Sequence, residues 1–215
     1  VVLPRGGSMR SGQADLVVKV PAASGLEVAA VSADVETRRV TGAQRVSSVS
    51  GNLGLDVAAA PLELKTVSGD VVLRGSGQQA VVRLATVSGD VRIDRVGGEI
   101  EVTTVSGDLA LGLGVLRSLR VRSTSGDVTL RGAPERGAAL EAESVSGDVS
   151  FTLQPAAGFS LDAESFSGDI GTCYGARGAS TRGMGPGSAL RGTRGEGGAR
   201  LRIKTMSGDI TVCDR

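Results

Sequence analysis

Short segments in which apolar and polar residues alternate recur along most of this chain, in pairs separated by a Gly-Asp turn. Before the turn the pattern is apolar–x–apolar–x–small followed by Val, as in residues 62–67 and 100–105. After the turn it is apolar–x–apolar, as in residues 71–73 and 91–93. Alternation with a period of two on both sides of a turn predicts two half-buried β-strands per unit. Glycine permits the backbone conformation that such a bend needs.

The turn defines an internal repeat. Ser-Gly-Asp occurs seven times, preceded by the degenerate copies Ser-Ala-Asp at 32–34 and Ser-Gly-Asn at 50–52. The spacing is 18 to 21 residues, except for the last interval of 40. The turn residues are Asp34, Asn52, Asp70, Asp90, Asp108, Asp127, Asp148, Asp169 and Asp209. Repetition at this period is typical of a solenoid, and the doubled interval predicts one rung that carries a long Gly-rich insertion at about 171–198.

The residues five positions before each turn serine indicate how the units stack. In chain order they are Glu27, Arg45, Glu63, Arg83, Glu101, Arg120, Glu141, Asp162 and Arg202, so the sign of the charge alternates at every step but one. Alternation is stabilising if each residue lies beside its counterpart in the next unit, about 4.8 Å away. We therefore expect an all-β, parallel β-solenoid of about nine rungs in one domain, 26–215, after a lead-in or cap, 1–25. The crossover rule favours a right-handed coil.

The composition disfavours several classes of function. The 215 residues include no Trp, one Tyr and three Phe, so Val, Leu, Ile and Ala must fill a thin core. A net charge of +1 gives no field that would attract nucleic acid. No stretch approaches the roughly 18 apolar residues of a membrane helix. The absence of His removes the commonest general base and zinc ligand. We expect a protein that is not an enzyme and has no cofactor.

The turn carboxylates allow two interpretations. Each Asp can accept backbone N–H bonds within its own turn, as turn Asp residues commonly do. Alternatively, a hard cation such as Ca²⁺ can bridge the column Asp70, Asp90, Asp108, Asp127 and Asp148, although the nonapeptide pattern of calcium-binding rolls is absent. A second column of hydroxyls lies two residues before each turn Ser. We expect it to pack near the bend, because no base is available to activate a nucleophile.

The two cysteines occupy the same position of the repeat. Cys173 and Cys213 each follow a turn Asp by four residues. Stacking would place their Cα atoms about 5 Å apart, which suits a disulfide. Such a bond would stabilise the fold by about 4 kcal/mol, because it lowers the entropy of the unfolded chain. It also implies an oxidising compartment, so we expect export to the periplasm or the cell surface. The alternative is a pair of free thiols in a cytosolic protein.

The insertion between the cysteines is basic. It contains Arg177, Arg182, Arg191 and Arg194 against a single acid, Glu196. The insertion either covers the end of the solenoid or forms a contact surface for an acidic partner or an anionic envelope component. A final rung that stays uncovered offers unpaired backbone groups. Either the insertion or residues 1–23 cap the ends, or rods associate with one another end to end or along an edge.

The chain resembles the bacterial β-strand-repeat family named for adhesins, a domain of unknown function. The resemblance lies in the segment Thr-Val-Ser-Gly-Asp-Val at 66–71 and 86–91 and in the Ser-Gly-Asp units on either side of the insertion. The resemblance extends from about Leu26 onward. It implies a β-solenoid that acts as an adhesin-like or envelope-associated binding protein for a protein or polymer, and it brings no catalytic residues. Related solenoid domains are similar to sensor modules of envelope-stress systems, so a module that binds a sensor or regulator is an alternative. A second alternative is an acid-based polysaccharide enzyme, which the 2% aromatic content disfavours.

Overall fold

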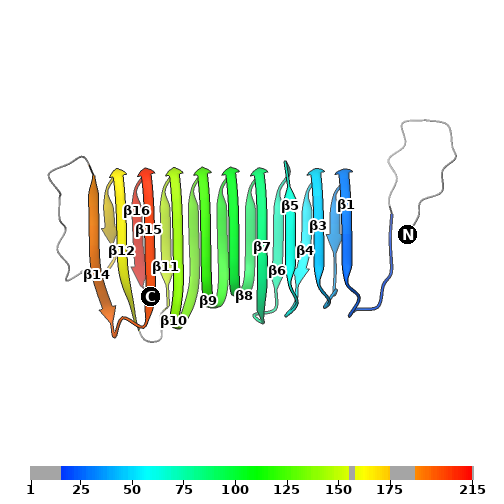
Figure 1. Cartoon of the computed structure of the whole chain (residues 1–215), viewed down its shortest axis with the longest axis horizontal. Helices are drawn as coiled ribbons and strands as arrows, with labels where there is room; N and C mark the ends of the chain where they lie inside the picture. The colour runs from blue at the N-terminus through cyan, green and yellow to red at the C-terminus, as the bar shows by residue number, and fades with distance from the viewer. Residues whose placement is uncertain (1–15, 155–157, 175–186, 215) are drawn as a thin grey trace.

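The computed structural model describes residues 16–154, 158–174 and 187–214. Within these residues every helix or strand assigned is a β-strand, and the strands form one continuous sheet that winds into two facing layers along a rod (Figure 1). Neighbouring strands pair in parallel at every described contact except one. The expected all-β, parallel β-solenoid is therefore confirmed, whereas its handedness stays a prediction.

The two facing layers are called here the first and the second sheet. The first sheet contains, in spatial order, β1 (Leu26–Ser32), β3 (Gln44–Ser50), β5 (Leu62–Thr66), β7 (Gln79–Ser88), the later parts of β8 (Val91–Ser106), β9 (Leu109–Ser125) and β10 (Val128–Ser146), then β15 (Ala199–Ser207), β12 (Gly158–Ser167) and β14 (Ser188–Gly195). The second sheet contains β2 (Val35–Thr37), β4 (Leu53–Val57), β6 (Val71–Gly75), the earlier parts of β8, β9 and β10, then β11 (Val149–Leu153), β16 (Ile210–Asp214) and β13 (Ile170–Thr172).

The core is a thin apolar layer between the sheets. Leu64, Leu73, Ile93 and Val102 are each fully buried, as their inward places in the alternation predict. Nine turns follow one another along the edge of the rod, but the outermost ones lead into second strands of only three residues, β2 and β13. About seven coils are therefore complete on both sheets, and the expected nine rungs are approximate.

The turn glycine is required by both conformation and space. Gly107 has φ = 118°, a region that side chains with a Cβ rarely adopt. A Cβ at Gly107 would also collide with the carbonyl oxygen of Gly89 in the preceding turn. Ala33 occupies this position in the first turn, and no described turn lies beneath it there. The glycine thus permits the close stacking of one turn on the next.

The stacking order departs from the chain order near the C-terminal end. The last repeat, β15 and β16, lies between β10–β11 and β12–β13 (Figure 1). The doubled interval does contain the expected long insertion, but the prediction that neighbours in sequence are neighbours in space is wrong here. Chain order would place Glu141 beside Asp162, two like charges, whereas the observed order places Arg202 between them.

The described parts of the insertion and of the N-terminal lead-in lie at opposite ends of the rod (Figure 1). The insertion expected at 171–198 contains the end of β13 and the whole of β14, which pairs antiparallel with β12. At the other end, residues 16–25 form no strand, and Val17 is 82% exposed. Residues 1–15 and 175–186 lie outside the described part. The division into a lead-in, 1–25, and a solenoid domain, 26–215, stays a prediction.

Candidate binding surfaces

The turn carboxylates form a hydrogen-bonded ladder along one edge of the rod. The Oδ1 atom of every turn residue except Asp169, the last in spatial order, accepts a bond of 2.7–3.0 Å from the backbone N–H of the turn residue in the next rung. In spatial order the members are Asp34, Asn52, Asp70, Asp90, Asp108, Asp127, Asp148, Asp209 and Asp169. The expectation that each Asp bonds within its own turn is wrong, because the acceptor lies in one rung and the donor in its neighbour.

This arrangement bears on the suggested cation column. One oxygen of Asp70, Asp90, Asp108, Asp127 and Asp148 accepts an N–H bond. Within residues 16–154, 158–174 and 187–214, no group of three or more potential ligands gathers closely enough to hold a metal ion. The ladder therefore acts as a structural link between rungs.

The hydroxyl column is buried just inside the turns. Its described members are Ser48, Thr66, Thr86, Thr104, Ser123, Ser144, Thr205 and Ser165. All but Ser165 donate to the carbonyl oxygen of the turn Ser two residues later, at 3.1–3.3 Å. Ser165 donates instead to the carbonyl oxygen of Gly208 in the adjacent rung. These hydroxyls are thus engaged in fixing the bend.

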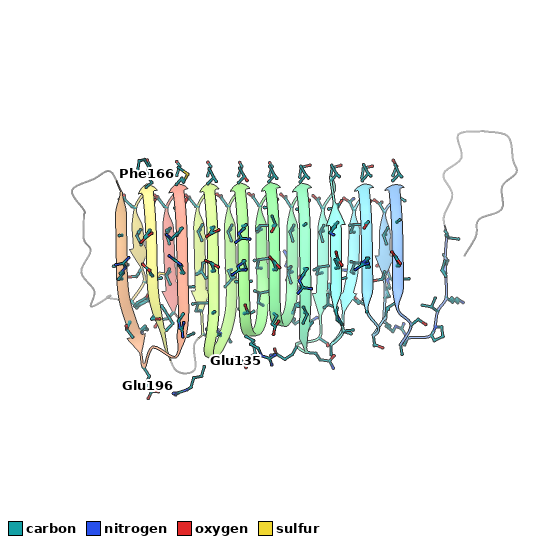
Figure 2. The ribbon with its side chains drawn as sticks, viewed as in Figure 1. Glu135, Phe166 and Glu196 are labelled. Atoms are coloured by element: carbon teal, nitrogen blue, oxygen red, sulfur yellow. A yellow bond between two sulfur atoms is a disulfide. The ribbon has the colours of Figure 1, made fainter. Side chains whose placement is uncertain are left out.

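An exposed apolar column, which was not predicted, follows the same edge. It consists of the residue immediately before each turn Ser: Val31, Val49, Val67, Val87, Val105, Val145, Met206 and Phe166, with Thr124 completing the series. Val67, Val87 and Val105 are each 47% exposed, and Figure 2 shows Phe166 at the rim of the rod. The signal was present, since strict alternation from Leu62 places Val67 on the outward face.

The charge column crosses the middle of the first sheet. Its register runs Glu27, Arg45, Glu63, Arg83, Glu101, Arg120, Glu141, Arg202, Asp162 and Arg191. In this spatial order the sign of the charge alternates at every step. Alternate charges at the spacing of strands attract their neighbours on both sides, so the column favours this register over others.

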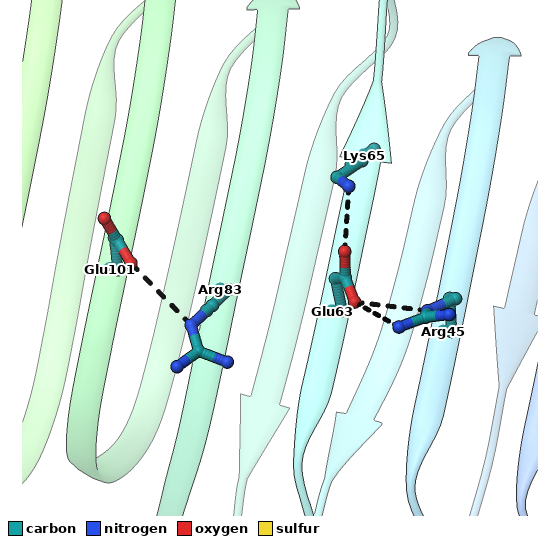
Figure 3. Close-up of polar contacts among 5 residues, drawn as sticks. All are labelled: Arg45, Glu63, Lys65, Arg83 and Glu101. Carbon is teal, nitrogen blue, oxygen red and sulfur yellow. Dashed lines mark hydrogen bonds and ion pairs between the residues drawn. The ribbon is translucent and has the colours of Figure 1, made fainter.

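Individual pairs in the charge column make direct contact (Figure 3). The carboxylate of Glu63 lies 2.8 Å from Nη2 of Arg45 and 2.8 Å from Nζ of Lys65. Hydrogen bonds from Lys65 and then Arg45 hold the pKa of Glu63 below its usual range. Arg83 and Glu101 are farther apart, at 3.8 Å. Each of these side chains is at least one-third exposed, so each pair contributes little by itself.

At the C-terminal end, the cysteines form the expected disulfide. Cys173 and Cys213 are bonded, with Cα atoms 4.8 Å apart, which confirms the prediction from their equal register. The bond links the residue that follows β13 to β16. It therefore joins the last repeat of the chain to the rung that lies outside it in the stack. The prediction of an oxidising compartment follows from this bond but is not tested by it.

Tyr174 and its neighbours pack beside the disulfide. The ring of Tyr174 meets Phe159 edge-on, with centroids 5.5 Å apart. The guanidinium of Arg194 lies 5.7 Å from the centroid of the Tyr174 ring and 2.6 Å from the carboxylate of Asp214. Burial, assisted by the charge of Asp214, raises the pKa of Tyr174 to about 12. The phenol therefore stays protonated at neutral pH.

Two of the four arginines suggested as a partner contact are described, and both bind the rod itself. Arg191 lies 2.9 Å from Asp162 and 3.2 Å from Glu164, and Arg194 pairs with Asp214. Arg177 and Arg182 lie outside the described residues. The structure thus uses half of the basic set to attach β14, and the role of the set as a partner contact stays a prediction.

The chain matches the model of the Toastrack family, DUF4097, over residues 3–154 and again over 114–213. It belongs to the Toastrack family. The two matches overlap, which a repeat protein permits because its units resemble one another. Toastrack is a domain of unknown function, so membership accounts for the solenoid and does not test a role in adhesion. No curated protein and no solved structure matches this chain. No helix in the described part of this Toastrack chain is long and apolar enough to cross a membrane.

Proposed function

We propose that this Toastrack solenoid is a non-catalytic scaffold, a rod that presents aligned columns of side chains to a protein or polymer of the bacterial envelope, as an adhesin-like protein would. The apolar column is the observation that carries this proposal. The carboxylate and hydroxyl columns are occupied by hydrogen bonds between or within rungs, whereas Val67, Val87 and Val105 remain half exposed in a continuous row. Exposed apolar rows of this extent are typical of interaction sites.

The disulfide supports the same proposal. A disulfide between two cysteines that are adjacent only in the folded rod persists in oxidising compartments. Rigid stacking suits a spacer outside the cytoplasm, because each rung adds about 4.8 Å of length at a fixed orientation.

The test compares two triple variants as immobilised ligands for native envelope fractions. Replacing Val67, Val87 and Val105 with Ser removes the centre of the apolar column and should abolish retention of the wild type's bound component. The matched control replaces Arg92, Ala110 and Thr129, outward residues of the second sheet, and should retain it. Equal retention by both variants contradicts the proposal. A hydrolase or lyase activity that is lost on changing one particular Asp or Arg contradicts it as well.

A module that binds a sensor or regulator is the second candidate. It is favoured by the attachment of β14 through Arg191 and Arg194, which brings both ends of the basic insertion to one end of the rod. Replacing Arg177 and Arg182 with Ser should abolish binding to the sensor while leaving the apolar-column interaction intact. An acid-based polysaccharide enzyme is the weakest candidate, because the aligned carboxylates serve the turn ladder.

A further inference from the structure

The C-terminal end of the rod is a half-rung. At the C-terminal end the first sheet extends to β14, but the described part of the second sheet ends at β13, one strand short. β14 is paired on one edge by β12, and its other edge meets no described strand. A single strand added to β13, opposite β14, would complete a rung there.

The N-terminal segment has the sequence of the missing half. Asp15 precedes Asp34 by 19 residues, one repeat period, so residues 16–20 occupy the register of the strand that follows a turn. Leu16, Val18 and Val20 then match the buried Leu53, Leu55 and Val57 of β4.

Residues 16–20 lie beside the N-terminal end of the rod but belong to no sheet. Leu16, Val17, Val18 and Val20 are 40–82% exposed. The connection that follows them is already stacked, since the N–H of Thr41 donates to Ala22 at 2.7 Å. An apolar segment in the register of a strand, with no described rung on its outer side, calls for a partner surface.

We propose that a second copy of this chain supplies that surface, and that the rods join head to tail. Residues 16–20 of one copy would fill the place opposite β14 of the next, and together they would form one shared rung. β14 would pair with β1 across the joint, which brings Leu190 beside Val28 and joins the two cores. The association goes beyond the proposed scaffold function and does not depend on it.

The charge column supports this joint. Its spatial series begins with Glu27 at one end and finishes with Arg191 at the other. Head-to-tail joining would set Glu27 beside Arg191 of the next copy and continue the alternation, whereas joining two like ends would bring like charges together. A heterologous contact related by translation does not close on itself, so it yields linear assemblies.

Cysteine cross-linking of the oxidised full chain tests the joint. In the proposed register Ala29 meets Ala189 of the next copy, so an Ala29→Cys variant mixed with an Ala189→Cys variant should give a covalent dimer. Ala85→Cys, in the same column but mid-rod, is the control and should not cross-link with Ala29→Cys. Sedimentation velocity of the unmodified chain should show mass that grows with concentration.

Two further variants separate the strand from the charges. Val18→Asp should abolish the cross-link, although its circular dichroism should match the wild type because Val18 is exposed in the single chain. Glu27→Arg should weaken association at least about tenfold, whereas Glu101→Arg, in mid-column, should not weaken it. A chain that is monomeric at all concentrations, or equal cross-linking of Ala29→Cys to Ala85→Cys, would overturn the proposal. An undiminished cross-link with Val18→Asp would overturn it too.

Discussion

Arg202 of β15 lies in register beside Glu141 of β10, although the repeat that follows Glu141 in the chain contributes Asp162. The last repeat thus enters the rod between two repeats that precede it. Asp162 is flanked on its other side by Arg191 of the antiparallel strand β14, at 2.9 Å. Each of these charges has only unlike neighbours, which stacking in chain order would not allow.

The substitution Asp162→Arg tests this order. Stacking in chain order would make the change nearly neutral, because the new Arg would attract Glu141 on one side and repel Arg202 on the other. The observed order predicts destabilisation, since three cations would become adjacent in the column. We expect Tm to fall by about 3 °C, the size that lost surface pairs give in a chain of this length. Glu141→Gln, measured in the same thermal scans, should lower Tm by less, and an unchanged or raised Tm for Asp162→Arg would refute the order.

Removing the disulfide should destabilise the C-terminal rungs. The bond joins residues 40 apart in the chain, so its loss should cost about 4 kcal/mol by the chain-entropy relation. The double variant Cys173→Ser, Cys213→Ser should therefore unfold at a lower urea concentration than the wild type. A reductant should lower the wild-type midpoint toward that of the variant and leave the variant unchanged. An unchanged wild-type midpoint under full reduction would contradict the expectation.

Replacing a turn Asp with Asn should preserve the stability of the fold, whereas replacing it with Ala should reduce that stability. Asn52 already serves in it, because its Oδ1 accepts the N–H of Asp70 at 3.0 Å. Asp108→Asn retains an acceptor for the N–H of Asp127, so its unfolding free energy should stay close to that of the wild type. Asp108→Ala removes the acceptor and should cost about 1 kcal/mol. Chemical denaturation of both variants measures the difference, and equal losses would show that the ladder bond is not what stabilises the turn.

The lowered pKa of Glu63 should depend on its cation neighbours. Because the folded pKa is depressed, the stabilisation is present above the unfolded pKa, about 4.3, and is lost as pH falls through the folded value. Hydrogen bonding to Lys65 is the largest cause, so Lys65→Gln should raise the Glu63 pKa toward its ordinary range. Carboxyl NMR titration of wild type and variant measures this directly. An identical titration curve would show that Arg45 alone depresses the pKa.

Much of the fold was predictable because the strands and the turn of each repeat are specified by residues within that repeat. Alternation within 62–67 and 71–73 determines which side chains enter the core, and the Gly-Asp turn determines where the strand direction changes. The equal register of Cys173 and Cys213 was enough to predict their bond, since strands stacked in register place equivalent Cα atoms within disulfide range. The hydrogen bonding of the turn Asp residues between rungs was not predicted, because the donor and acceptor belong to different repeats.

The period, the two strands of each rung and the face on which each side chain lies follow from local sequence, because they depend on neighbours within a few residues. The order in which the rungs stack depends on contacts between distant parts of the folded chain. Repeats of equal length present nearly interchangeable edges, so local pattern does not select a partner. The exchange of the last two repeats and the antiparallel strand β14 come from contacts such as those of Arg202 and Arg191 with Asp162, which form only when distant parts of the chain stack.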